Sequence, residues 1–313
     1  MGSIREISTG QTRLLEPEHV IGRAAAPGCS QTVNHPYVSA VHAVLRWTGQ
    51  DWELKDLNSR NGTYLDGQRV TPSGPCKVGK GSRIGFGART DEWEVVDAGA
   101  PEVMAVPLDG RDPVRLVGEM IPLPSSDDPT ATIYRAADGT WVLEQADGPL
   151  VALANAQVFE AVGRLWRFCC SDLSQRTIAS SGAHALSTQL EIEKLELTFS
   201  VSRDEEYVHL RARCSGRDID LGAYAYHYLL LTLARRRLED VEQGLPETSC
   251  GWVDVEDLAR DPTMAPPRLN IEVFRLREQF AKVGVVDAAK IIERRVRPRQ
   301  LRIGSGRLTI ETL

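Results

Sequence analysis

The first 97 residues consist of short apolar runs that Gly, Asn and Pro interrupt every few positions. In the runs Val41–Trp47 and Trp52–Leu57, apolar residues alternate with polar ones or stand in short blocks, a pattern typical of strands in a sheet. Many short strands at this spacing favour two packed antiparallel sheets. Residues 1–97 are therefore predicted to form an all-β sandwich.

The bulk composition places the chain among soluble globular proteins. Its 313 residues are enough for two or three domains, and 42% hydrophobic with 26% charged residues is ordinary for such proteins. No stretch approaches the roughly 18 apolar residues of a membrane helix, and the start has no apolar secretory segment. We expect a cytoplasmic protein without a membrane partner.

Sequence signatures of catalysis and of metal binding are missing. The six cysteines form no CxxC pair and no cluster with histidine, so neither a zinc site nor another cofactor is expected. The chain has no phosphate loop, no His-Glu-x-x-His and no Gly-x-Ser-x-Gly motif. We therefore expect no catalytic residues, no enzyme activity and no small-molecule substrate.

Residues 98–172 read as further strands. The segment Thr132–Glu144 contains an Asp-Gly turn between two strand-like runs, which predicts a hairpin, and it echoes Val44–Lys55. Gly163–Phe168 similarly echoes Gly81–Phe86. These echoes favour a degenerate internal duplication of the first domain, and a β extension of that domain is the alternative. Residues 173–189 are small and polar, which is linker composition.

Four short motifs occur in order within the first domain. They are Ile21-Gly22-Arg23, Ser39-Ala-Val-His42, Asp56–Gly67 with Asn61-Gly62 inside it, and Gly81–Gly87. A phosphate dianion is bound best by a guanidinium fork and by hydroxyl donors on rigid loops, and Arg23 and Ser39 supply these groups. Asn61-Gly62 suits a tight turn whose amide side chain still reaches a peptide backbone.

Together the motifs resemble those of the forkhead-associated (FHA) domain, over about 95 residues. The resemblance implies that Arg23 and Ser39 contact a phosphothreonine and that Asn61, assisted by Arg60, holds the peptide backbone. It implies that the remaining motif residues shape the binding loops from behind: Gly22, His42, Gly62 and Thr63. If residues 98–172 share this fold, they lack the Ser-x-x-His and Asn-Gly motifs and are a structural or protein-contact copy.

Two positions depart from the FHA pattern. Family members often carry Arg or Asn directly after the serine and a basic residue two positions before it, whereas this chain has Ala40 and Tyr37. A hydrogen bond to a charged group is worth about 1.5–3 kcal/mol, so each missing donor weakens binding by about tenfold or more. The alternative is therefore an FHA fold that has lost phosphate binding.

From residue 190 the pattern changes to strands, three helices and a terminal hairpin. Residues 195–313 resemble the winged helix-turn-helix output domains of response regulators, most clearly over Asn270–Phe280. Ile291–Val296 and Gln300–Ile303 fit the two arms of the wing. The fold class expected for the whole chain is thus multidomain, with an all-β FHA sandwich, a second β segment and an α/β winged helix at residues 190–313.

The winged-helix resemblance implies that the third helix enters the major groove of double-stranded DNA. Residues 268–302 carry ten basic and four acidic side chains on a chain of net charge −6. The spacing of Val273, Leu276 and Phe280 predicts that these side chains face inward. The candidate DNA contacts lie outward or on the wing: Arg268, Asn270, Phe274, Arg275, Glu278, Arg294, Arg295, Arg297 and Arg299. Because glutamates lie among the arginines, protein contact is the alternative.

These expectations combine into a bacterial signalling protein. One end reads a phosphothreonine on a Ser/Thr kinase or on its substrate, and the other binds DNA and regulates transcription. The alternative is a phosphorylation-dependent scaffold in which both ends bind proteins. A third hypothesis is autoinhibition, in which a phosphorylated linker residue such as Thr177 or Thr188 occupies the chain's own FHA site.

Overall fold

The computed structural model describes residues 1–313 except 24–28, 72–73, 89–92, 137, 147, 172–189, 261–263 and 265. The predicted linker 173–189, with Thr177 and Thr188, lies outside the described residues. The chain divides into two compact units. Unit 1 comprises residues 1–104, 155–157 and 168–178, and unit 2 comprises 105–154, 158–167 and 179–313. Most of the middle segment therefore shares a unit with the carboxy-terminal part.

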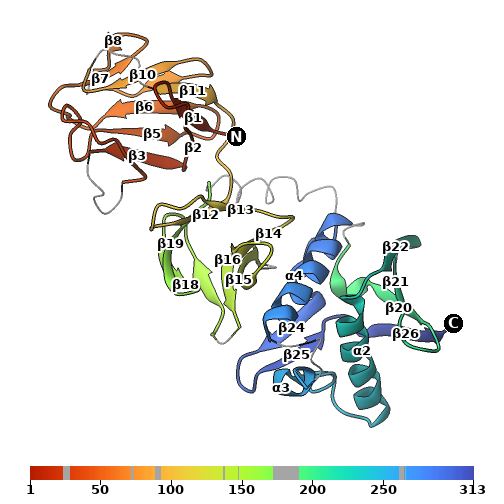
Figure 1. Cartoon of the computed structure of the whole chain (residues 1–313). Coiled ribbons are helices and arrows are strands. Elements are labelled where there is room, and N and C mark those ends of the chain that lie inside the picture. The colour runs from red at the N-terminus through yellow and green to blue at the C-terminus, as the bar shows by residue number, and fades with distance from the viewer. Residues whose placement is uncertain are drawn as a thin grey trace. The chain divides into compact units, whose positions relative to one another are not determined.

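Residues 1–97 form the predicted sandwich of two sheets (Figure 1). One sheet has the order β2 (Thr12–Leu14), β1 (Ser3–Glu6), β11 (Trp93–Asp97), β10 (Arg83–Phe86), β7 (Thr63–Leu65) and β8 (Gln68–Arg69). The other has the order β4 (Gln31–Thr32), β3 (Glu18–Gly22), β5 (Ala43–Trp47), β6 (Trp52–Asp56) and β9 (Cys76–Val78). The inward-facing residues of both sheets, among them Leu45, Trp52, Ile84 and Phe86, form one buried apolar core.

The middle segment contains two four-stranded sheets, the second of which is antiparallel throughout. Their orders are β13 (Val114–Arg115), β12 (Met104–Pro107), β19 (Arg164–Cys169), β18 (Val158–Ala161), and β14 (Met120–Pro124), β15 (Pro129–Arg135), β16 (Trp141–Gln145), β17 (Val151–Leu153). The first domain without β4, β7 and β8 has the matching orders β2-β1-β11-β10 and β3-β5-β6-β9. The two segments therefore share one strand connectivity.

This connectivity tests the two sequence echoes separately. The hairpin predicted at Thr132–Glu144 is present as β15 and β16, which occupy the places that β5 and β6 have in the first domain. The second echo is wrong. The strand at Gly163–Phe168 is β19, which pairs with β12 as β11 pairs with β1, so its counterpart is β11 and not β10. Short Gly-led apolar runs recur in any β domain, and sequence alone did not distinguish the neighbouring strands.

The carboxy-terminal part combines two small sheets with helices. The sheet β22 (Arg217–Ala223), β21 (Val208–Cys214), β20 (Glu196–Val201), β26 (Arg307–Thr312) has β26 parallel to β20 and is otherwise antiparallel. The second sheet is β23 (Val253–Asp254), β25 (Gln300–Ile303), β24 (Ile292–Arg295). The α-helices are α2 (His227–Glu242), α3 (Val255–Leu258) and α4 (Pro266–Lys282), and Ile192–Lys194 (η1) and Ala288–Ile291 (η3) form short 3-10 helices.

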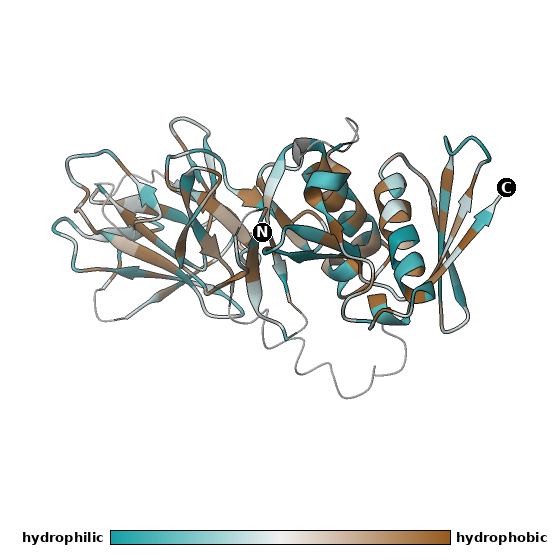
Figure 2. Ribbon diagram, turned by 90° about the horizontal axis from the view of Figure 1, so that it is seen from below, coloured by the Kyte–Doolittle hydropathy of each residue, from teal (hydrophilic) through white to brown (hydrophobic). Residues whose placement is uncertain are grey.

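The two long helices pack on these sheets through apolar stripes. Leu229, Leu230 and Leu233 of α2 join the buried core, and the α4 stripe predicted to face inward is buried in the same core. Figure 2 shows both apolar and polar residues along the helices. In the part of the chain that the structure describes, every helix is too short or too polar to cross a bilayer.

Three strands of this part were not predicted: β22, the two-residue β23 and β26. β22 follows β21 through a turn at Ser215-Gly216, where both residues have positive φ values, of 50° and 80°. This is the backbone of a two-residue hairpin turn, and Gly is the residue that suits it best. β26 was missed because its pairing with β20, more than a hundred residues earlier, leaves no local sequence signal.

Candidate functional site

Three loops meet at one edge of a sheet in the first domain. The end of β3, the start of β5 and the end of β6 are neighbours because these three strands pair antiparallel in sequence order. Arg23 follows β3, Ser39 precedes β5, and Arg60 and Asn61 lie between β6 and β7. The register thus brings the four predicted ligand-binding residues to one place.

Ser39 lies at the centre of this edge. Its hydroxyl oxygen accepts a hydrogen bond of 3.0 Å from the backbone N–H of Arg60. Its carbonyl oxygen accepts the backbone N–H of Arg23 at 2.8 Å. Because Arg60 already donates to the hydroxyl oxygen, the hydroxyl hydrogen is available as a donor to an incoming anion.

Arg23 presents an exposed side chain beside this hydroxyl-bearing loop. Among the described residues, no hydrogen bond or ion pair engages its guanidinium group. Its backbone position is fixed by Gly22, where an added Cβ would lie 2.0 Å from the carbonyl oxygen of Ala40. Only glycine allows the two loops to approach this closely.

His42 joins two of the loops from beneath. Its Nδ1 accepts the backbone N–H of Ser39 at 3.0 Å, so its proton is on Nε2, which donates to the carbonyl oxygen of Gly62 at 3.2 Å. The ring is fully buried and packs edge-on against Phe86, with 5.7 Å between ring centroids. Burial lowers the pKa of His42 below its ordinary value of 6.5, although the Gly62 carbonyl and Asp56 oppose this effect.

The lowered pKa of His42 predicts a pH dependence of stability. The unfolded chain takes up a proton near pH 6.5, before the folded chain does. Protonation of His42 therefore leaves the free energy of unfolding unchanged above pH 6.5. This free energy falls as the pH decreases from 6.5 toward the lower pKa of the folded state. Thermal melting of the full chain between pH 7.5 and 5 measures this loss, and His42→Gln should flatten it. An equal pH dependence in both proteins would contradict the assignment.

A polar cluster at the end of β6 holds the third loop. The Asp56 carboxylate accepts the backbone N–H of Ser59 at 3.0 Å and the hydroxyl groups of Ser59 and Thr63 at 2.6 Å each. Burial raises the pKa of Asp56, but these hydrogen bonds outweigh burial and hold the pKa below its ordinary value. Sequence analysis gave Asp56 and Ser59 no role, although an Asp three residues before a Ser is a common turn signal.

Asn61 and Gly62 form the tip of this loop. Gly62 has a φ of +87°, and the Asn61 amide Nδ2 donates to the carbonyl oxygen of Tyr37 at 2.8 Å. The amide oxygen and the second N–H of Asn61 stay available to a peptide backbone. Tyr37 thus contributes its backbone here, and the exposed Ala40 has no polar side-chain atom to offer. Tyr37 also receives close support from Gly87, where a Cβ would lie 2.3 Å from its carbonyl oxygen.

Arg69 adds a cation that sequence analysis did not select. It lies on β8 opposite Tyr64 of β7, and its side chain is exposed. A Cβ at Gly62 would lie 2.5 Å from the Arg69 Nε, so this guanidinium group lies against the Asn61-Gly62 turn. Arg69 therefore supplies positive charge to an edge that lacks basic residues at Tyr37 and Ala40.

The two-sheet fold and this set of loops define an FHA domain, and residues 19–87 match the sequence profile of that family. FHA domains are phosphopeptide-binding modules and not enzymes. Over 72 residues the chain is 39% identical to the FHA domain-containing protein FhaB of Mycobacterium tuberculosis, which covers 23% of this chain and 45% of FhaB. It is also 39% identical over 74 residues to human kanadaptin, covering 20% of this chain and 10% of kanadaptin. The chain thus spans less than half the length of these relatives.

Two solved structures are similar to part of the chain. The FhaA FHA domain, crystallised with an intracellular protein domain, is 29% identical and covers 28% of this chain and 92% of its own, with a TM-score of 0.25. Mycobacterium tuberculosis EmbR in complex with a phosphopeptide is 24% identical and covers 32% of this chain and 25% of its own, with a TM-score of 0.27.

The candidate DNA contacts of the carboxy-terminal part differ in accessibility. Arg275, Arg297 and Arg299 are exposed. Arg268 is exposed but lies 3.1 Å from Glu272, and Glu278 pairs with Lys282 at 2.7 Å. Arg275, Arg297 and Arg299 therefore stay candidates on their exposure alone.

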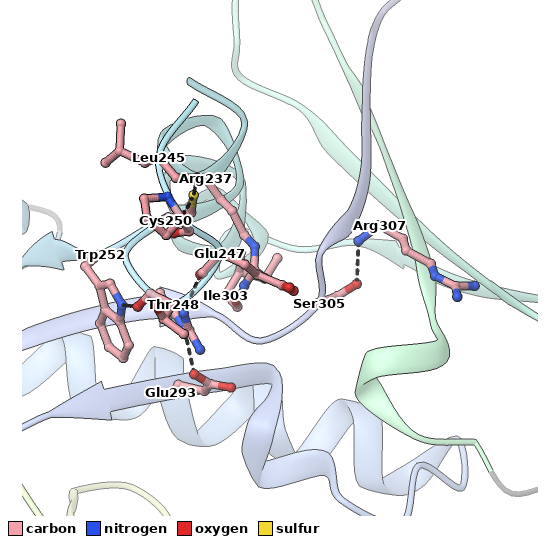
Figure 3. A network of polar contacts seen from close by, with 12 residues as sticks. Arg237, Leu245, Glu247, Thr248, Cys250, Trp252, Glu293, Ile303, Ser305 and Arg307 are labelled. Atoms are coloured by element: carbon pink, nitrogen blue, oxygen red, sulfur yellow. Dashed lines mark hydrogen bonds and ion pairs between the residues drawn. The ribbon is translucent and has the colours of Figure 1, made fainter. Parts of the chain in front are cut away.

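Arg295 has a structural partner at the turn end of the β24–β25 hairpin. Its guanidinium group lies 3.8 Å from the Trp252 ring centroid and donates to the Thr248 carbonyl oxygen at 2.8 Å. Arg302 lies 4.5 Å from the same ring centroid and pairs with Glu293 at 2.6 Å. Figure 3 shows Thr248, Trp252 and Glu293 gathered at this point. Arg295 is thus tied to the loop before β23.

Three candidates are buried or bound to other residues of unit 2, namely Phe274, Arg294 and Asn270. Phe274 was predicted to face outward, but its side chain is only 3% exposed, and this prediction is wrong. Arg294 lies with its Nε 3.1 Å from the Glu144 carboxylate, at ion-pair distance without hydrogen-bond alignment, and donates to the Asn270 amide oxygen at 3.0 Å. Arg294 is engaged because the middle segment, which supplies Glu144, lies beside α4, and helical periodicity does not reveal this second neighbour.

Proposed function

We propose that residues 1–97 bind phosphothreonine in a protein partner, a Ser/Thr kinase or its substrate. Arg23 and the Ser39 hydroxyl bind the phosphate, Asn61 holds the peptide backbone, and Arg60 assists. The observation that carries this proposal is the Ser39 hydroxyl, which the Arg60 backbone N–H orients. The exposed Arg23 is joined to the same serine, because its backbone N–H binds the Ser39 carbonyl oxygen. His42 positions the loops through its hydrogen bonds to Ser39 and Gly62 and does not touch the ligand, while Gly22 and Thr63 brace them.

Replacing Arg23 by alanine should weaken binding of a phosphothreonine peptide by at least about tenfold, because a charge-assisted hydrogen bond is lost. Titration of fluorescent phosphothreonine peptides into the full chain measures the effect. Arg46→Ala is the matched control, since Arg46 is exposed at the opposite end of β5. Equal affinities for the wild type and Arg23→Ala would exclude Arg23 from the site.

We infer that residues 104–169 are a degenerate FHA copy that does not read phosphate. The shared strand connectivity supports this inference. The strands missing from the copy, β4, β7 and β8, border the loops that carry Arg23, Ser39 and Asn61 in the first domain. The copy is thus a packing module.

For residues 190–313 we propose a winged helix-turn-helix that binds double-stranded DNA, which makes the protein a phosphorylation-dependent transcription regulator. Three α-helices followed by the β24–β25 hairpin support the fold. Arg297 and Arg299 in the hairpin turn are exposed and suited to backbone phosphates. The alternative function is a scaffold in which this domain binds protein, and the buried Phe274 favours that alternative.

Changing Arg297 and Arg299 together to alanine should reduce affinity for duplex DNA at low salt. The slope of log affinity against log salt should fall by about 2, since each phosphate contact contributes about 0.9. The control is the charge-matched pair Arg211→Ala with Arg217→Ala, exposed on β21 and β22. Selection from a random duplex pool supplies the ligand, and no enrichment by the wild type would favour the scaffold.

A further inference from the structure

One flank of α4 is covered by the middle segment. The flank includes Arg277, which binds Glu144, and Ala281, whose Cβ would lie 3.6 Å from a Cβ at Gly118. It lies about a quarter turn around the helix from Val273, Leu276 and Phe280, which face the core. α4 packs against β15, and Arg277 is 2% exposed. Residues 105–154 and 158–167, which share a unit with α4, are here named the cap, and the cap thus occupies a flank of this helix.

The cap is held by a buried ionic cluster. The Glu144 carboxylate of β16 accepts two hydrogen bonds from Arg277, at 3.0 and 3.1 Å, and one from the Tyr134 hydroxyl at 3.0 Å. Arg277 also donates to the carbonyl oxygen of Ile292. The cap therefore supplies one carboxylate to the two guanidinium groups of Arg277 and Arg294.

The cap and the major groove of DNA cannot occupy α4 at the same time. The major groove is about 12 Å wide and accepts a single helix of about 10–12 Å diameter. A sheet packed on the flank of α4 leaves no room for the groove walls. The cap also engages Arg294 through Glu144, and Arg294 in turn holds the Asn270 amide, two of the residues that a reading helix and wing would present.

We propose that the cap is an intramolecular competitor of DNA, with Glu144 in the place of a DNA phosphate, and that DNA binds only after the cap leaves α4. A phosphate group can replace the carboxylate, because it accepts the same charge-assisted hydrogen bonds from the two guanidinium groups. The proposal rests on the DNA-binding function proposed above for residues 190–313.

A reversible disulfide tests it, and because Gly118 has a φ of +64°, the reduced double variant is the reference for the strain of the substitution. A Cβ at Gly118 would lie 3.6 Å from the Cβ of Ala281, within the range of disulfides, so Gly118→Cys with Ala281→Cys should lock the cap on α4. We expect the oxidised protein to bind a labelled random duplex pool at least about tenfold more weakly than the reduced protein. Wild type under both conditions controls for the six native cysteines, and Glu144→Gln should bind more tightly than wild type.

The outcomes separate the two claims. Equal, measurable affinity of the oxidised and reduced forms would overturn the cap as a competitor and leave the DNA-binding function standing. No duplex binding by the reduced double variant or by Glu144→Gln would overturn the DNA-binding function, and with it the proposed competitor. Amide hydrogen exchange in α4 supplies a readout without DNA, and unchanged exchange in Glu144→Gln would also overturn cap release.

Discussion

Replacing Glu144 by alanine should lower the free energy of unfolding of unit 2 by about 3–5 kcal/mol, the usual cost of breaking a buried ion pair. The change leaves Arg277 buried without its two carboxylate hydrogen bonds and removes the counter-charge of Arg294. Burial alone would raise the pKa of Glu144, but the two arginines hold the pKa below its ordinary value, so the carboxylate is charged at neutral pH.

Two further variants separate this effect from ordinary packing loss. Tyr134→Phe removes one hydrogen bond to Glu144 and should cost about 1 kcal/mol. Glu160→Ala, at an exposed position of β18, should cost almost nothing. Urea unfolding followed by tryptophan fluorescence measures all three, and a loss for Glu144→Ala no larger than that for Glu160→Ala would show that the cluster is not formed.

Gly22→Ala should abolish phosphopeptide binding and destabilise the first domain. The new Cβ would lie 2.0 Å from the Ala40 carbonyl oxygen and 3.0 Å from the Cys29 Sγ, so the loop that carries Ser39 must move. Overpacking of this kind costs about 1–3 kcal/mol. Moving the loop also separates the Ser39 hydroxyl from Arg23, which should lower peptide affinity well beyond tenfold, roughly the effect of losing two charged hydrogen bonds.

The matched control is Gly79→Ala. A Cβ at Gly79 meets no atom within 4 Å, and its backbone is not in the left-handed region. This variant should keep the melting temperature and the peptide affinity of the wild type. If Gly22→Ala behaves like Gly79→Ala in thermal melting and in peptide titration, the close approach of the two loops is not part of the site.

The FHA domain was predictable because its site residues belong to short motifs that the sequence shows directly. Gly22-Arg23, Ser39-x-x-His42 and Asn61-Gly62 each place a residue at a strand end, and the antiparallel register brings the ends together. Arg69 was missed because its place beside Gly62 depends on the pairing of β7 with β8.

The carboxy-terminal part was less predictable, because the spacing of apolar residues in a helix indicates only the face that packs on the core. The spacing of Val273, Leu276 and Phe280 correctly marked the side toward the core. It gave no sign that a sheet from the middle segment binds Arg277 on the adjacent flank, or that Phe274 is buried. A buried arginine and an exposed one look alike in sequence, since only a distant Glu144 makes the difference.

Phosphothreonine recognition at the loop edge can be measured most directly by backbone amide NMR of the full chain during titration with a phosphothreonine peptide. The largest chemical-shift changes should fall on Ser39, Arg60 and Asn61, with none on Arg46, and the unphosphorylated peptide should cause no change. Shifts that are the same with and without the phosphate, or that fall outside the loops around Ser39 and Asn61, would contradict phosphothreonine recognition at this site.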